Sequence, residues 1–138
     1  RAADVAALLS ELEELADPRI LAVNQRHGDD HAVNLTKLRV VAKRLKTDHP
    51  LAVALWATGD TAARLLALLT ARPMEFAAAD LDAMLRDART PKVRDWLVGY
   101  VVTRSPHAED LRVAWHADPD AAVQAAGWAL TASRVAKK

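Results

Sequence analysis

The placement of proline is the feature that most constrains how this chain can fold. Five of the six prolines lie at or near an expected helix start, and four of these directly follow a residue type that caps helices. Those five are Pro18, Pro50, Pro91, Pro106 and Pro119. Between them apolar residues recur at helical spacing, and no segment combines an alternation of period two with hairpin turn residues. The sequence therefore predicts an all-α array of about nine short helices joined by tight turns.

The spacing of the helix starts indicates a repeat. Starts near Thr61, Pro91 and Pro119 mark two-helix units of about 30 residues, somewhat shorter than the ~40 to 47 residues of typical HEAT repeats. Stacked helix pairs form a curved superhelix, and its concave surface serves binding more often than chemistry. We therefore predict an α-α superhelix of HEAT-like helical repeats that forms a single domain over residues 1–138.

Composition excludes several classes of protein. The 138 residues include no cysteine, which rules out disulfides, thiolate metal sites and cysteine nucleophiles and suits a cytoplasmic location. No apolar run approaches the ~18 to 20 residues of a membrane span. Nothing resembles a signal peptide, although the chain begins with arginine, so we expect that a short leader or tag was removed. Because no glycine-rich phosphate loop, zinc signature or nucleophile-base triad is found, we expect no cofactor and no metal.

The charge of the chain is balanced overall but not locally. Lys and Arg number 19 and Asp and Glu 18, so binding to nucleic acid would need a local patch. The helix expected over residues 34–46 offers one, since five cations fall within ten residues without an acid among them. They are Lys37, Arg39, Lys43, Arg44 and Lys46. This face is either simply solvated or a ridge that contacts phosphates.

The stretch His27-Gly28-Asp29-Asp30-His31 has a composition that a metal site would share. Two imidazoles and two carboxylates lie within five residues. A polar loop after the helix-ending Gly28 has the same composition without any metal, and the spacing places no further ligands nearby. We therefore interpret the stretch as a loop.

Residues 90–102 form the longest nearly apolar helical run. Thr90 is the expected N-cap, and apolar side chains then occupy nearly every direction, which predicts a helix covered on most sides. Asp95, beside Trp96, is either a structural acid satisfied by a neighbouring arginine or helix start, or part of a site. Gly99, four residues on, leaves a notch that serves either close helix packing or a ligand.

The four tryptophans are expected to anchor the core, since each lies among leucine, valine or alanine at helical spacing. They are Trp56, Trp96, Trp115 and Trp128. For Trp96 the choice between core packing and ligand contact is the most open, because Asp95 adjoins it and Lys92 precedes it by one helical turn.

Four short segments match one family in order and spacing. They are Leu38–Lys43; Leu55-Trp56 followed by Asp60 and Arg64 before a leucine-rich helix; Arg94-Asp95-Trp96; and Trp115–Pro119 leading into Val123–Ala126. From about Leu12 to Leu130 the chain resembles the DNA alkylation repair family, the small DNA glycosylases built from HEAT-like helical repeats. The resemblance implies an α-solenoid whose concave, basic face binds duplex DNA. It also implies an enzyme that excises purines alkylated at the 3- or 7-position.

The resemblance also implies site residues. Family enzymes use a tryptophan and, one turn later, an aspartate, and this pair falls on Asp95 and Gly99, or on Trp96 and Tyr100 after a one-residue shift. Asp95 and Trp96 are therefore the expected catalytic residues, and Tyr100 and Trp128 the expected aromatic lining. A carboxylate stabilises the positive charge that develops on the sugar as the base leaves, and an aromatic face attracts a cationic base. Neither alignment places a carboxylate at the second position.

Two functions are consistent with these residues. The first is DNA-repair-type binding of duplex DNA, alkylated DNA included, with or without excision. The cations expected to contact this DNA are Arg39, Lys43, Arg44 and Lys46, with Lys92 and Arg94 nearby. The second is a noncatalytic scaffold that binds a protein partner or DNA, and it is motivated by the near-zero net charge and the missing second carboxylate. Neither function involves a membrane.

Overall fold

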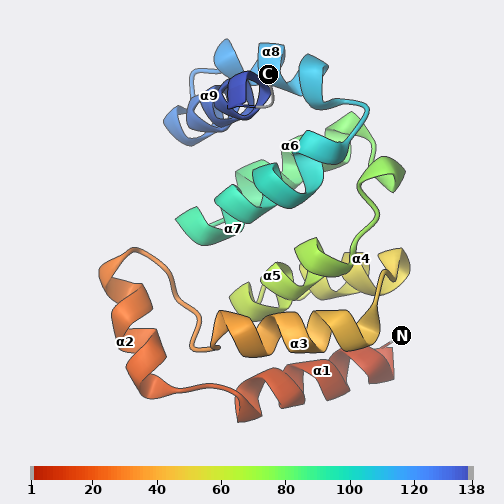
Figure 1. The fold of residues 1–138 in the computed structure, drawn as a ribbon, viewed down its shortest axis with the longest axis vertical. Helices are drawn as coiled ribbons and strands as arrows, with labels where there is room; N and C mark the ends of the chain where they lie inside the picture. The colour runs from red at the N-terminus through yellow and green to blue at the C-terminus, as the bar shows by residue number, and fades with distance from the viewer. Residues whose placement is uncertain (1, 137–138) are drawn as a thin grey trace. The chain divides into compact units, whose positions relative to one another are not determined.

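The computed structural model describes residues 2–136. In this part of the chain nine α-helices follow one another, and the only β pairing is one isolated antiparallel bridge between Ala16 and Val33. The α-helices are α1 (Ala2–Glu14), α2 (Pro18–Arg26), α3 (Leu35–Leu45), α4 (His49–Ala57), α5 (Thr61–Thr70), α6 (Ala78–Asp87), α7 (Pro91–Trp96), α8 (Ala108–His116) and α9 (Ala121–Ala136). The shorter turns are the 3₁₀ segments η1 (Pro73–Glu75) and η3 (Val102–Arg104) and the π-helical segment η2 (Leu97–Val101). The all-α prediction is confirmed (Figure 1).

Local capping explains where many of these helices begin. At four helix starts a side-chain oxygen accepts a backbone N–H. The four capping residues are Asp17, Asn34, Asp48 and Asp60. The last helix begins two residues later than expected, because Oδ1 of Asp120, and not of Asp118, accepts the N–H groups of Ala122 and Val123 at 2.9 and 3.1 Å. None of the described helices is long and apolar enough to cross a membrane.

The chain divides into two compact units. The N-terminal unit comprises the residues up to Arg72 together with Thr90–Val93, and the C-terminal unit comprises Pro73–Arg89 together with the residues from Arg94 onward. The division therefore falls inside α7. Folding of residues 1–138 as one repeat domain stays a prediction.

Helix α5 forms the core of the N-terminal unit. Nine of its ten residues are buried; α3 and α4 pack against it, and α1 contacts both α4 and α5. Even Arg64 is buried there, with its guanidinium carbon 4.5 Å from the ring centroid of the half-buried Trp56. α5 is thus more completely buried than residues 90–102, the stretch that the apolar pattern singled out.

In the C-terminal unit α8 packs closely against α9. A Cβ atom added at Gly127 would lie 2.9 Å from the backbone nitrogen of His116 and 3.2 Å from the carbonyl carbon of Trp115, so only glycine permits this approach. The other close pair is α4 with α5. The two close pairs therefore begin at α4 and α8. The units expected to start near Thr61 and Pro119 would begin one helix later, at α5 and α9.

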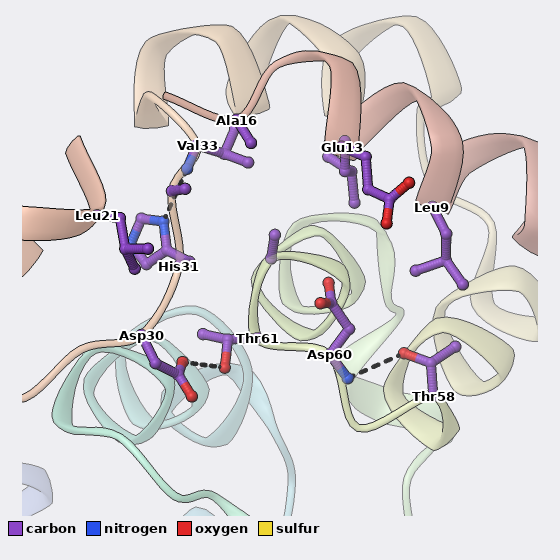
Figure 2. Close-up of a pocket in the computed structure, with 13 residues that line it drawn as sticks. Leu9, Glu13, Ala16, Leu21, Asp30, His31, Val33, Thr58, Asp60 and Thr61 are labelled. Atoms are coloured by element: carbon purple, nitrogen blue, oxygen red, sulfur yellow. Dashed lines mark hydrogen bonds between the residues drawn. The ribbon is translucent and has the colours of Figure 1, made fainter. Parts of the chain in front are cut away.

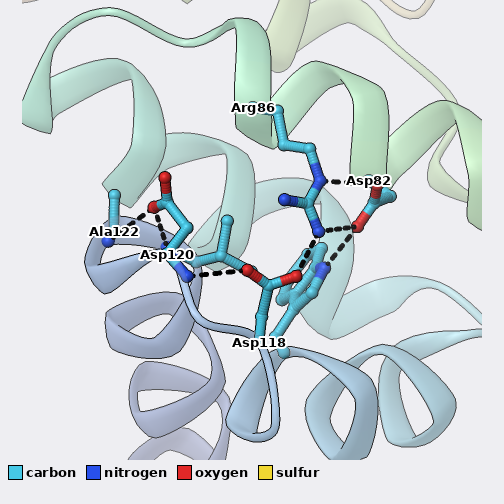
Figure 3. Close-up of polar contacts among 7 residues, drawn as sticks. Asp82, Arg86, Asp118, Asp120 and Ala122 are labelled. Carbon is cyan, nitrogen blue, oxygen red and sulfur yellow. Dashed lines mark hydrogen bonds and ion pairs between the residues drawn. The ribbon is translucent and has the colours of Figure 1, made fainter.

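A polar network holds α6 against the turn between α8 and α9 (Figure 3). The Arg86 guanidinium binds Asp82, with Nε 2.9 Å from Oδ2, and also binds Asp118. The fully buried Trp115 donates its indole N–H to Oδ1 of Asp82 at 2.9 Å. These bonds lower the pKa of Asp82, chiefly through Arg86, and the pKa of Asp118 is lowered by Arg86 as well. The Trp115–Pro119 segment is therefore a structural element of the C-terminal unit.

Candidate nucleic-acid interface

The predicted basic stripe lies on the outer face of α3. All five of its cations are exposed, whereas Leu38 and Val41 of the same helix are buried. The five are Lys37, Arg39, Lys43, Arg44 and Lys46. The helix ends at Leu45, one residue earlier than expected, because Lys46 adopts a positive φ of 60°. We call this set of five cations the α3 basic face.

Arg44, a member of the α3 basic face, is ion-paired with a neighbouring helix. Its Nη1 and Nη2 donate to the two carboxylate oxygens of Glu11, on α1, at 3.0 and 2.7 Å. This bidentate bond lowers the pKa of Glu11 and raises that of Arg44. Glu11 thus offsets the charge of Arg44, while the side-chain ammonium groups of Lys43 and Lys46 have no hydrogen-bond or ion-pair partner within residues 2–136. The DNA-contacting role of these cations stays a prediction.

The start of α7 is capped from a distant loop, and the expected cap is wrong. The backbone N–H of Lys92 donates to Oδ1 of the buried Asp29 at 3.1 Å. Oγ1 of Thr90, the predicted N-cap, is buried without a hydrogen-bond partner. Asp29 and Lys92 both belong to the N-terminal unit, so this contact fixes the loop of residues 27–31 within it.

His31 in the same loop has a structural role. Its ring is buried, its carbonyl oxygen accepts the side-chain N–H of Asn24 at 2.8 Å, and its Nδ1 accepts the N–H of Val33 at 3.4 Å. Burial, as the largest cause, lowers the pKa of His31, which favours the neutral imidazole. Within the described residues no group of three or more potential metal ligands occurs.

Arg94 also makes a structural contact. Its Nη1 donates to the carbonyl oxygen of Ala88 at 3.1 Å, just beyond the C-terminal end of α6, and the side chain is half-buried. A cation there satisfies an orphan carbonyl and complements the helix dipole. The DNA contact expected of Arg94 would therefore compete with this bond. Lys92, the other cation expected near the DNA, has a half-buried side chain and belongs to the N-terminal unit.

Asp95 is exposed, so the expectation that it lies on a helix covered on most sides is wrong at this position. Neither a neighbouring arginine nor a helix start satisfies it, because its carboxylate has no hydrogen-bond or ion-pair partner in the described chain. Trp96, the next residue, is 7% exposed and meets Tyr100 edge to face, with the ring centroids 5.3 Å apart. The two expected catalytic residues thus face differently: one toward solvent and one into the protein.

Gly99 lies in the π-helical segment η2 and opens onto free space. A Cβ atom added there would have nothing within 4 Å, so close helix packing does not explain this glycine. Its carbonyl oxygen accepts the hydroxyl of Thr103 at 2.8 Å. π-helical turns are rare and often occur at functional sites. The surface of Asp95 and Gly99 is therefore accessible to a ligand.

Trp128 is not a core anchor, unlike the buried Trp96 and Trp115. Its side chain is 64% exposed, and its ring meets the imidazole of His116 edge to face at a centroid distance of 4.5 Å. An exposed indole can stack on a base. The lining role predicted for Tyr100 and Trp128 stays a prediction.

A hollow of about 360 Å³ in the N-terminal unit has an acidic rim (Figure 2). The carboxylates of Glu13, Asp30 and Asp60 line it, together with His31 and apolar residues of α1. Asp30 also accepts the hydroxyl of Thr61 (Figure 2). Three carboxylates repel phosphate, so this hollow is not a nucleic-acid site.

Residues 8–138 match the family described as DNA alkylation repair enzyme. The chain belongs to the DNA alkylation repair family. The fold is similar to that of a solved structure, with a TM-score of 0.83 and 26% sequence identity, and the match covers 92% of the present chain. That protein belongs to a family related to the HEAT-like repeat DNA glycosylases, with affinity for branched DNA structures, and the match spans 55% of its length. No curated protein matches the chain.

Two acids shape the candidate interface of this DNA alkylation repair protein and were not predicted. Glu11 pairs with Arg44, and Asp29 caps the helix that carries Asp95. The sequence carried a weak signal for the first, since acids on one helix and cations on a nearby helix attract each other. It carried none for the second, because nothing in the residues around Asp29 indicates which helix start it meets.

Proposed function

We propose that this member of the DNA alkylation repair family binds DNA through the α3 basic face, and branched DNA in preference to linear duplex. The observation that carries the proposal is the similarity, at a TM-score of 0.83, to a protein with affinity for branched DNA. The local excess of cations on α3 supports it, because the chain as a whole is nearly neutral.

Within the α3 basic face, Lys43 and Lys46 are the strongest candidates for phosphate contacts. Both are exposed, and neither has a partner in the described residues that would have to be displaced. Arg44 would first have to leave Glu11. Each phosphate neutralised by a cation releases counterions, so the affinity falls as salt rises, with a slope of about 0.9 per contact on a logarithmic scale.

The test compares a four-way DNA junction with a linear duplex of the same length. We expect tighter binding to the junction, and the double variant Lys43→Gln/Lys46→Gln should weaken binding to both and reduce the salt slope by about 1.8. The matched control Arg19→Gln/Arg26→Gln removes the same charge from exposed residues of α2. Fluorescence anisotropy over a range of salt concentrations measures both quantities.

Two results would contradict the proposal. Absence of binding at low salt would reject a DNA partner and favour the noncatalytic scaffold that binds protein. An equal loss of affinity in the α2 control would show that net charge, and not the α3 basic face, is responsible.

A second candidate function is excision of N-alkylated purines, with Asp95 as the residue that acts on the sugar. The observation that favours it is an exposed carboxylate without a partner in the described residues, one helical turn before the open position Gly99. A carboxylate that is neither paired nor packed can approach a ligand and stabilise developing positive charge. Trp96 would support the helix beneath it, because it is buried.

Excision predicts release of 7-methylguanine or 3-methyladenine from methylated DNA. We expect Asp95→Asn to abolish release, whereas Asp110→Asn, which neutralises another exposed acid of the C-terminal unit, should not. Chromatography of the released bases measures the activity. If the wild-type protein releases nothing while it binds DNA, excision is rejected and DNA binding stands.

A further inference from the structure

We propose a phosphate-binding site in the C-terminal unit, at a hollow between α8 and α9. The hollow has a volume of about 280 Å³, and its polar lining residues are Thr103, Glu109, Arg112, Ser133 and Arg134. The assignment of its phosphate to the DNA backbone rests on the proposed function. The site itself rests on the residues of the hollow alone.

The charge of the hollow is positive, because two guanidiniums face one carboxylate. Nε and Nη2 of Arg112 donate to the Glu109 oxygens at 2.9 and 2.7 Å, and Nη1 of Arg134 lies 3.2 Å from both of them. These contacts, chiefly the hydrogen bond from Arg112, lower the pKa of Glu109 to about 2. Glu109 therefore stays ionised, and one positive charge remains uncompensated.

Arg112 is held in place, while Arg134 is free to turn toward a ligand. Nη1 of Arg112 also donates to Oγ1 of Thr131 at 3.2 Å, so all three of its nitrogens are engaged. In the described residues Arg134 uses only Nη1, which leaves Nε and Nη2 unpaired. Its pair with Glu109 is exposed on both sides, a geometry that contributes little and is readily exchanged.

A hydroxyl donor completes the site. The hydroxyl of the half-buried Ser133 has no hydrogen-bond partner in the described part of the chain, whereas the hydroxyl of Thr103 donates to Gly99. Nε and Nη2 of Arg134 match two oxygens of a phosphate, and the Ser133 hydroxyl can donate to a third. The acidic hollow of the N-terminal unit, with three carboxylates on its rim, has the opposite preference.

The first experiment titrates the whole chain with inorganic phosphate, while ¹⁵N NMR follows Nε–H of Arg134 and the backbone amide of Ser133. We expect both signals to shift and saturate, and sodium chloride at equal ionic strength to produce no such shift. Arg134→Gln should abolish saturation at the Ser133 amide, and Glu109→Gln should lower the phosphate concentration needed for saturation, because both guanidiniums are then released.

The control variant is Arg19→Gln, which removes one positive charge from a side chain that is 95% exposed in the N-terminal unit. It should leave the titration unchanged. Absence of a saturable shift in the wild type would overturn the proposal. An equal loss in Arg19→Gln, or a shift reproduced by chloride, would do the same.

The second experiment identifies the source of the phosphate with the four-way junction. If it is the DNA backbone, Arg134→Gln reduces the salt slope of junction binding by about 0.9. An unchanged slope, with a saturable phosphate titration, assigns the site to a free phosphate group and overturns the DNA assignment. A junction that does not bind while phosphate saturates the site rejects the proposed function and the DNA assignment, but leaves the phosphate site standing. Junction binding through α3 without phosphate saturation rejects only this site.

Discussion

Gly127 determines how closely α9 approaches α8, and replacement by alanine tests this. The added Cβ would lie 2.9 Å from the nitrogen of His116 and 3.2 Å from the carbonyl carbon of Trp115. Both are backbone atoms, so no rotation of a side chain relieves the contact, and the two helices must move apart. Gly99→Ala is the matched control, because nothing lies within 4 Å of the corresponding Cβ.

Two terms of opposite sign determine the free energy of unfolding of these variants. Alanine favours helical backbone over glycine by about 0.8–1 kcal/mol, and this gain is common to both variants. Overpacking against backbone costs about 1–3 kcal/mol, and only Gly127→Ala incurs it. The Gly127→Ala variant should therefore unfold with a free energy about 1–3 kcal/mol below that of Gly99→Ala. At about 4 °C per kcal/mol for a chain of this size, the Tm values should differ by about 4–12 °C.

Urea unfolding, followed by far-UV circular dichroism and by tryptophan fluorescence, measures this difference. Both probes should give the same midpoint for each variant, with an unchanged m-value. If Gly127→Ala and Gly99→Ala have equal midpoints, the distance between α8 and α9 is not set by Gly127 and the reasoning is refuted.

Three further variants test contacts that link distant segments. Asp29→Ala removes the cap of α7 and should lower the free energy of unfolding by about 1 kcal/mol in urea titration, whereas Thr90→Val should cost nothing because the hydroxyl has no partner. Asp82→Ala leaves the buried indole N–H of Trp115 without an acceptor and should cost about 1–3 kcal/mol by the same assay. The pKa of Glu109 is lowered in the folded state, so its stabilisation is complete above pH 4.5 and is lost as the pH falls to about 2. Glu109→Gln should flatten the acid limb of the stability profile, and an unchanged limb would contradict the assignment.

Most helix starts could be predicted because capping is a local interaction. Asp48 and Asp60 each accept an N–H only three residues ahead, so the residue types and their spacing already contain the bond. Helix α7 begins at Pro91 as predicted, but its cap could not be predicted in this way. Its acceptor, Asp29, is 63 residues away from Lys92, and that contact exists only once the N-terminal unit has folded. Thr90 is of a residue type that caps helices, but its hydroxyl is buried without a hydrogen-bond partner.

The candidate interface was predicted in its residue types and not in its pairings. The cations of α3 follow from the helical period, which places Arg39 and Lys43 on the side away from Leu38 and Val41. That Glu11 occupies Arg44 depends on how α1 packs beside α3, across 33 residues of sequence. Hence a count of cations overstates the charge that is available to a phosphate.

Trp128 shows where apolar composition alone misleads. In α9 alanine occupies both the buried and the exposed side, as at Ala126 and Ala129, so the pattern around Trp128 contains little information about its direction. Gly127 was the more informative residue. A glycine inside a helical pattern costs stability and often marks a close approach, and here it identifies the side of α9 that meets α8.

The segment after Asp95 shows why the family's residue spacing transfers poorly to this chain. Counting four residues from Asp95 to Gly99 assumes α-helical bonds, but the N–H of Val102 reaches the carbonyl oxygen of Leu97, five residues back, as well as that of Val98. Both alignments place the second member of the pair in the π-helical segment Leu97–Val101, where α-helical spacing does not hold throughout, and which of them applies stays a prediction. Nothing lies within 4 Å of a Cβ atom added at Gly99, and the ring of Tyr100, the next residue, meets Trp96 edge to face. The Gly99→Ala variant tests whether this open space holds a ligand. Weakened DNA binding in a variant at least as stable as the wild type would identify it as a ligand surface, whereas unchanged binding would show that no ligand contacts it.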